Sequence, residues 1–314
     1  MKKYLSSGLV IMLSLFTAGC FEQEQSIQPF YSKDYVVQVP EASGAWDVIE
    51  ENSQVKQEHE PVTWFIEEKN LDIYEESGNI SHLGIVFFKI GDQLFADITA
   101  GAMNNDTIGF EWARHVLPTH SLHKVTIENN RIILADINKE WLNDALKEKK
   151  VHLAYVEGEN LPEVFTASSA DWISFLKEQK DNQDLFSKDA VVLKKNITKN
   201  DFFKFYTAWQ AFIEQPEIKI SSRPNDYILN ESYQAMIQLG KPALPLLIAK
   251  IKEGNLTFWR ESQFFLWYAV RSITGVDLES KKTLELSEPE MARKYADWWE
   301  EELRKNMENQ EEQR

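Results

Sequence analysis

The spacing of hydrophobic residues changes once along this chain, near Lys195, and that change constrains the fold more than any other feature. Before it, apolar residues fall in short runs rich in β-branched and aromatic side chains, which is typical of strands. The dipeptides Gly91-Asp92 and Asn129-Asn130 separate two pairs of these runs and are typical of hairpin turns. After Lys195 the apolar residues recur at helical spacing. The sequence therefore predicts an α+β protein, with an antiparallel β-rich, barrel-like domain over residues 34–195 and an α-helical domain over residues 196–305.

The individual elements can be predicted from the same runs. Strands are expected at residues 35–39, 62–66, 83–90, 93–99, 122–127, 131–137 and 151–156, with a closing strand at 190–193. Two helices within this region are expected at residues 139–147 and 169–179. The later helices are expected at residues 202–213, 229–237, 244–251 and 258–273, and from Ser287 onward. Trp267 is expected in the core, because a large aromatic side chain at helical spacing buries much apolar area.

The amino terminus has the order of an export signal. Lys2 and Lys3 precede an apolar run over residues 9–16, and the small residues Ala18-Gly19 then lead to Cys20. The run is too short to cross a bilayer as a permanent helix, which needs about 20 apolar residues. We therefore expect residues 1–19 to be a signal peptide that is removed. An ordinary secretory signal, in which Cys20 has no special role, is the alternative.

Ala18-Gly19-Cys20 resembles the lipobox of bacterial lipoproteins, although Thr17 stands where leucine is usual. The resemblance implies that Cys20 is acylated, for example with palmitate, and becomes the first residue of a membrane-anchored protein. It also implies a location in the cell envelope outside the cytoplasm. Since Phe21 is not an aspartate-type retention signal, the outer membrane is expected where the cell has one, and otherwise the outer face of the plasma membrane.

The composition agrees with an exported chain. Cys20 is the only cysteine, so the chain has no internal disulfide. The polar, glutamine-rich residues 20–33 are expected to form a flexible tether, and residues 306–314 a disordered tail. The net charge is −16, and it becomes −18 when Lys2 and Lys3 are removed with the signal peptide. Such a charge repels nucleic acid, so no nucleic-acid partner is expected.

Three further segments resemble known families. Residues 231–253, with Leu239-Gly240-Lys241-Pro242 between two apolar stripes, look like one HEAT-type helical hairpin, which implies protein contact. Residues 84–194 resemble the amino-terminal domain of a family of bacterial lipoproteins that offers no activity to transfer. The residues that carry this second resemblance are "LFADI" at 94–98, "PTHSLHKV" at 118–125, "WL" at 141–142 and "FTASSADWISFL" at 165–176. Gly44-Ala45-Trp46 matches the G-x-W near the start of lipocalins, which agrees with a small barrel.

Few residues suggest chemistry. His115, His120 and His123 could bind zinc, which needs three or four ligands around one point. Strand alternation, however, would place His120 and His123 on opposite faces, and the alternative is ordinary packing. Asp97 lies in an apolar strand, and we expect it to make structural hydrogen bonds, with Arg114 as a possible partner, or to line a cavity.

The remaining catalytic patterns are absent or incomplete. Ser174 and Lys177 have the S-x-x-K spacing of penicillin-recognising enzymes, but the companion S-D-N and K-T-G elements are missing. The sequence therefore predicts an envelope lipoprotein that binds another envelope protein, without catalytic residues or a cofactor. The first alternative is a carrier with a small apolar ligand in the barrel, and the second is a metal-dependent enzyme.

Overall fold

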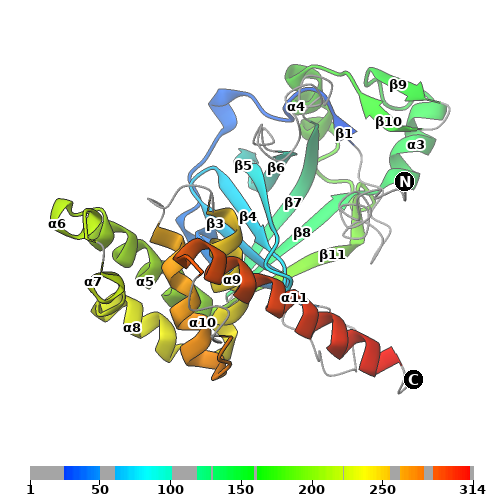
Figure 1. Ribbon diagram of the computed structural model, residues 1–314. Helices are drawn as coiled ribbons and strands as arrows, with labels where there is room; N and C mark the ends of the chain where they lie inside the picture. The colour runs from blue at the N-terminus through cyan, green and yellow to red at the C-terminus, as the bar shows by residue number, and fades with distance from the viewer. Residues whose placement is uncertain are drawn as a thin grey trace. The chain divides into compact units, whose positions relative to one another are not determined.

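The computed structural model describes residues 25–49, 61–100, 119–128, 130–158, 161–221, 223–254, 262–278 and 286–311 (Figure 1). The predicted signal peptide, Cys20, Arg114 and His115 lie outside these ranges.

A closed antiparallel barrel forms the β-rich part of the structure. Its strands are β2 (Gly44–Ile49), β3 (Thr63–Glu67), β4 (Asn70–Tyr74), β5 (Ile80–Ile90), β6 (Gln93–Ala100), β7 (His120–Glu128), β8 (Arg131–Ile137) and β11 (Phe186–Lys195). They follow the order β6-β5-β4-β3-β2-β11-β8-β7, and β7 pairs with β6 to close the barrel. The sheet continues beside β7 through β1 (Gln25–Ser26), β10 (Leu161–Phe165) and β9 (Tyr155–Gly158). Together with the helices that follow β11, the barrel confirms the predicted α+β class.

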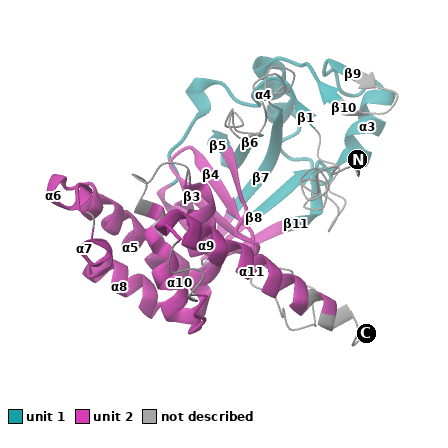
Figure 2. Ribbon diagram, viewed as in Figure 1, with its two compact units in different colours: residues 1–39, 84–126, 133–190 teal, residues 40–83, 127–132, 191–314 magenta. Residues whose placement is uncertain are grey.

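The chain forms two compact units that alternate along the sequence (Figure 2). Unit 1 comprises residues 1–39, 84–126 and 133–190, and unit 2 comprises residues 40–83, 127–132 and 191–314. Strands β5, β7, β8 and β11 each contribute residues to both units.

The core of unit 1 lies between one face of its strands and two helices. These helices are α3 (Lys139–Lys147) and α4 (Ser169–Glu178), and α4 begins with a capping box between Ser168 and Asp171. The buried Trp172 of α4 packs against the rings of Phe30 and Phe165. The strands add Phe88, Ile90, Phe95, Leu122 and Ile137 to the same cluster. Because this face of the strands meets the helices, the alternate positions face the inside of the barrel.

The segment before the barrel is part of the fold from Gln25 onward, although composition predicts a tether as far as residue 33. β1 pairs with β7 on one side and with β10 on the other. Phe30 has no exposed surface. Two expected strands differ. Residues 35–39 contain the end of a 3₁₀ turn (Lys33–Tyr35) and a single bridge from Val36 to Phe88. In the expected strand 151–156, residues 151–154 are not in a strand, and β9 begins at Tyr155.

Unit 2 contains the helices that follow β11. They are α5 (Ile197–Ile213), α6 (Pro216–Lys219), α7 (Pro224–Ile228), α8 (Glu231–Gln238), α9 (Leu244–Glu253), α10 (Leu266–Thr274) and α11 (Glu288–Glu311). Short 3₁₀ turns lie at Pro40–Ala42, Lys241–Ala243 and Ser262–Phe265. Gly240, at φ +70°, follows α8 and ends the first helix of the α8–α9 hairpin. In this hairpin, α8 contacts α5, and α9 contacts α10 and α11. Trp267 is buried in this core, as predicted.

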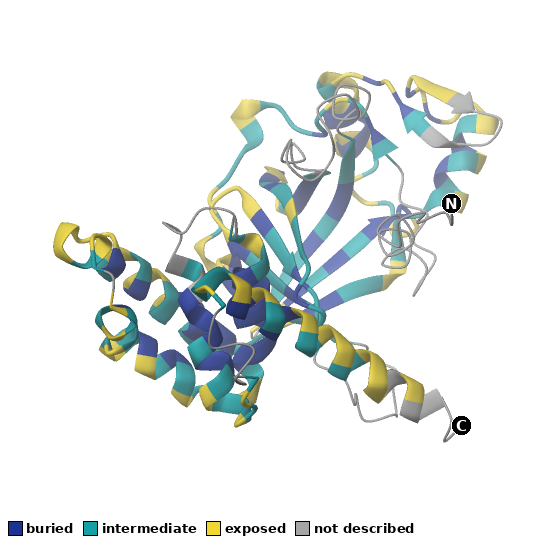
Figure 3. Ribbon diagram, viewed as in Figure 1, coloured by how far each residue is buried: buried dark blue, intermediate teal, exposed yellow. Residues whose placement is uncertain are grey.

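The last helix extends beyond the expected end of the helical domain. α11 continues to Glu311, through residues for which composition predicts disorder. The ion pairs Lys305–Glu301, at 3.3 Å, and Arg304–Glu308, at 4.0 Å, join successive turns of its exposed part (Figure 3). Among the described helices, none combines the length and the apolar character that a membrane span requires.

A candidate functional site on strand β7

Strand β7 carries two of the predicted histidines, and it turns them to opposite faces. In the register with β6, His120 lies opposite Thr99 and His123 lies opposite Ala96. His120 therefore shares its face with Asp97 and the helix-covered core, while His123 shares the barrel-facing side with Ser121. The strand alternation that the sequence predicts is confirmed here.

The pair on the helix-covered face is fully hydrogen-bonded. Asp97 is buried, and its Oδ1 lies 2.7 Å from His120 Nδ1 and accepts from Thr99 Oγ1 at 3.3 Å. Its Oδ2 accepts from the backbone N–H of Phe30 at 2.9 Å. Burial raises the pKa of the nearby Tyr31 phenol, and the negative charge of Asp97 adds to this effect. Asp97 thus makes structural hydrogen bonds, and His120 is one of its described partners. Arg114, the partner that the sequence suggested, lies outside the described residues.

The pair on the barrel-facing side forms a chain of three polar side chains. Ser121 Oγ lies 3.0 Å from His123 Nε2, and His123 Nδ1 lies 2.6 Å from Asp136 Oδ1. His123 is 3% exposed and Asp136 is 8% exposed, whereas Ser121 is only partly buried. The Ser121 hydroxyl also lies 3.3 Å from the carbonyl oxygen of Ile98, to which it can donate. The order serine, histidine, aspartate is the order of groups that activate a serine nucleophile.

The carboxylate of Asp136 has few partners for a buried charge. Neither of its oxygens, nor His123 Nδ1, has a hydrogen bond of regular geometry within the described ranges. The 2.6 Å contact between His123 Nδ1 and Asp136 Oδ1 is therefore short but lacks the geometry of a regular hydrogen bond. A buried carboxylate without hydrogen bonds is costly, and such exceptions call for an explanation.

No sequence pattern pointed directly to Ser121 or Asp136. Two residues apart on a strand, Ser121 and His123 share a face, so their proximity could have been inferred once the strand was predicted. Asp136 could not be placed in the same way, because the hairpin at Asn129-Asn130 brings β8 to β7 without fixing which residues face each other.

The histidines do not gather into a metal site within the described part of the chain. His120 and His123 engage different aspartates on opposite faces of β7. In the described ranges, no three histidine, cysteine or carboxylate side chains come together in a way that could hold a metal ion. His115, the third residue of the zinc hypothesis, lies outside these ranges.

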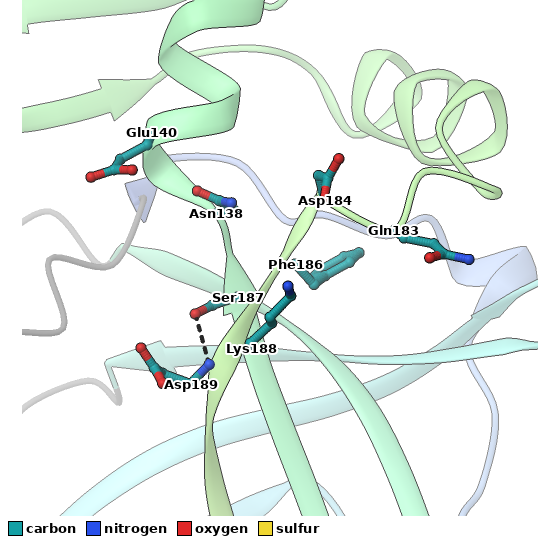
Figure 4. Close-up of a pocket in the computed structure, with 8 residues that line it drawn as sticks. All are labelled: Asn138, Glu140, Gln183, Asp184, Phe186, Ser187, Lys188 and Asp189. Carbon is teal, nitrogen blue, oxygen red and sulfur yellow. Dashed lines mark hydrogen bonds between the residues drawn. The ribbon is translucent and has the colours of Figure 1, made fainter.

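A pocket of about 480 Å³ lies elsewhere in unit 1, beside the start of β11 (Figure 4). Its lining is mostly polar and comprises Asn138, Glu140, Gln183, Asp184, Phe186, Ser187, Lys188 and Asp189. Ser187 Oγ accepts a hydrogen bond from the backbone of Asp189 at 3.1 Å, which shapes the strand locally. The side chains that line this pocket do not form a chain of short polar contacts like that of Ser121, His123 and Asp136 on β7 and β8.

Unit 2 holds a buried lysine in a polar network. Lys199 Nζ lies 2.9 Å from Asp47 Oδ1 and donates to Thr63 Oγ1 at 2.7 Å. Asn196 caps α5 and also donates to Asp47 Oδ2 at 2.6 Å. Because these bonds join the start of α5 to β2 and β3, the network is structural.

A second lysine of unit 2 lies between two aromatic rings. Lys250 Nζ is 5.3 Å from the ring centre of Tyr74 and 5.5 Å from that of Tyr206, and it pairs with Glu253 at 2.6 Å. Burial raises the pKa of both phenols far above the usual range, so they are neutral at physiological pH. The arrangement stabilises the interior around α9.

No protein-family model, curated protein or solved structure matches this chain. The functional argument therefore rests on the residues and geometry described above.

Proposed function

We propose that this protein is a lipoprotein, exported and held in the cell envelope by acyl chains on Cys20, and that it binds another protein there. The order of basic, apolar and small residues before Cys20 supports the export and the anchor. Cys20 and Gln25 are five positions apart, and β1 begins at Gln25. Five extended residues reach at most about 18 Å, so β1 would remain close to the membrane surface.

The exposed apolar residues of unit 2 support the binding role. Ile220 is 85% exposed and Leu229 is 74% exposed, and they follow α6 and α7 respectively. The hydroxyl of Tyr227 donates to the carbonyl oxygen of Ser221 at 2.9 Å, which connects α7 to the chain just after α6. Two large apolar side chains on one small folded segment are a feature of protein-binding surfaces, where they become buried against the partner. This exposure is the observation on which the binding proposal depends.

Site-specific photo-crosslinking in intact cells tests the binding role. We expect a photoreactive amino acid at Ile220 and another at Leu229 to produce adducts with the same partner protein. The same group at Lys204, an exposed position on α5 outside the segment 220–229, serves as the control. Equal adducts at all three positions, or none at Ile220 and Leu229, would contradict the proposal.

The carrier alternative needs open apolar surface inside the barrel. In unit 1, most of the described apolar positions that face inward are buried, namely Ile85, Phe87, Ala96, Ile98, Val125 and Leu134, and Leu94 is partly buried. These positions offer little surface to an apolar ligand, so we favour protein binding over ligand transport.

A further inference from the structure

The two histidines of β7 each contact one aspartate, and the two aspartates differ in how many regular hydrogen bonds they accept. Each oxygen of Asp97 accepts a regular hydrogen bond, and these bonds connect β6, β7 and the segment around Phe30. Asp136 contacts His123 alone at 2.6 Å, with no regular hydrogen bond to either oxygen in the described ranges. Asp136 therefore remains free to stabilise a positive charge that develops on His123.

We propose that Ser121, His123 and Asp136 form a nucleophilic serine site in unit 1 that reacts with small, uncharged carboxylic esters. Ser121 is the attacking group, because it alone of the three is partly exposed and its Oγ lies 3.0 Å from His123 Nε2. His123 is the base, and Asp136 is a positioning residue that acts through His123. Ile98 and Ala96 lie opposite Ser121 and His123 on β6, so the immediate surroundings of these two side chains are apolar and uncharged.

The reaction balances with water as the only co-reactant. Ser121 Oγ attacks the carbonyl carbon while its proton passes to His123 Nε2. The bond between that carbon and the alcohol oxygen breaks, and the departing alcohol takes the proton from His123. Water then attacks the acyl–serine, loses a proton to His123 and releases the carboxylic acid, after which the proton returns to Ser121. Ester and water thus give acid and alcohol, and no group is oxidised or reduced.

The hydroxyl of Ser121 has two possible hydrogen-bond partners in the structure. Its hydroxyl lies 3.3 Å from the Ile98 carbonyl oxygen, which is a long contact for an O–H donor, and 3.0 Å from His123 Nε2. A small rotation of the hydroxyl exchanges the first partner for the second. A buried Asp136 carboxylate is unfavourable without hydrogen bonds. When His123 accepts the proton, the positive imidazolium stabilises this carboxylate.

Covalent labelling of the full chain with a short-chain alkyl fluorophosphonate tests the site. Ser121 Oγ should displace fluoride, and the intact mass should rise by one phosphonyl group located on Ser121. We expect Ser121→Ala to abolish this adduct and His123→Ala to slow labelling about 100-fold, which is typical for loss of a general base. Ser174→Ala, at an exposed serine 3.4 Å from Glu178, is the matched control and should label normally.

Asp136→Asn separates positioning from stability. We expect this variant to label at least about ten-fold more slowly, because the developing imidazolium loses its counter-charge. Its melting temperature should equal or exceed that of the parent, because a poorly bonded buried charge is removed. An unlabelled Ser121 in the folded parent chain would overturn the proposal. So would a labelling rate that is unchanged in His123→Ala, or an Asp136→Asn variant that melts lower but labels normally.

Discussion

At the scale of single residues, the ion pair between the buried Lys199 and the partly buried Asp47 is expected to contribute to the stability of unit 2. Asp47→Asn should lower the free energy of unfolding by about 3–5 kcal/mol, because the buried Lys199 would lose the carboxylate that lies 2.9 Å from its Nζ. Urea denaturation followed by circular dichroism at neutral pH measures this loss.

The control for this prediction is an ion pair at the surface of the same unit. Glu214 and Lys219 are both more than half exposed, so Glu214→Gln should change the free energy of unfolding by less than about 1 kcal/mol. A comparable loss in the two variants would mean that burial does not determine the contribution of the Asp47–Lys199 pair.

The sequence predicted the face on which a residue lies where alternation within a single strand determines that face. Alternation alone placed Asp97 and Phe95 on one face and separated His120 from His123, and the register of β6 with β7 agrees. The link between His123 and Asp136 could not be predicted, because it depends on the pairing of two strands. The sequence therefore predicted which face of the strand His123 occupies, but not its contact with Asp136.

At the scale of elements, the segment that follows β1 is fixed by one aromatic side chain. Phe30→Ala should destabilise unit 1 by about 3–5 kcal/mol, because it leaves a cavity next to Trp172, whose ring centre lies 4.6 Å away. Limited proteolysis should then cut between residues 27 and 33 faster than in the parent chain. Gln28→Ala, at an exposed position two residues earlier, should leave both stability and cleavage unchanged.

The predicted elements were closest to the structure where turn chemistry marked their ends. β8 spans residues 131–137, as predicted after Asn130, which adopts φ +65°. β4 was missed, because its hairpin with β3 turns at Glu68, at φ +53°, and glutamate gives no turn signal. β11 begins at Phe186, four residues before the predicted strand, because the polar residues Ser187, Lys188 and Asp189 conceal its first half.

At the scale of the whole molecule, the sequence predicted a strand-rich region followed by a helical region, but it did not predict how the residues group into two compact units. β11 ends at Lys195 and α5 begins at Ile197, so the switch in hydrophobic spacing marks a real change of element. The compact units nevertheless interleave, because a closed barrel joins strands that are distant in sequence. Hydrophobic periodicity is a local signal and does not specify such pairings.

The anchor is also a property of the whole molecule, because one modified thiol would determine where every other residue resides. We predict that Cys20→Ala moves the protein from the membrane fraction to the soluble fraction, since each buried acyl methylene contributes about 0.8 kcal/mol and the variant has no acyl chain. Cell fractionation with immunoblotting measures the distribution, and mass spectrometry of the parent should find a lipid-modified Cys20 at the mature amino terminus. We expect Cys20→Ala to leave the described structure intact, and circular dichroism of the purified variant checks this. A variant that stays with the membrane, or a parent chain with an unmodified Cys20, would show that something other than lipid holds this protein in place.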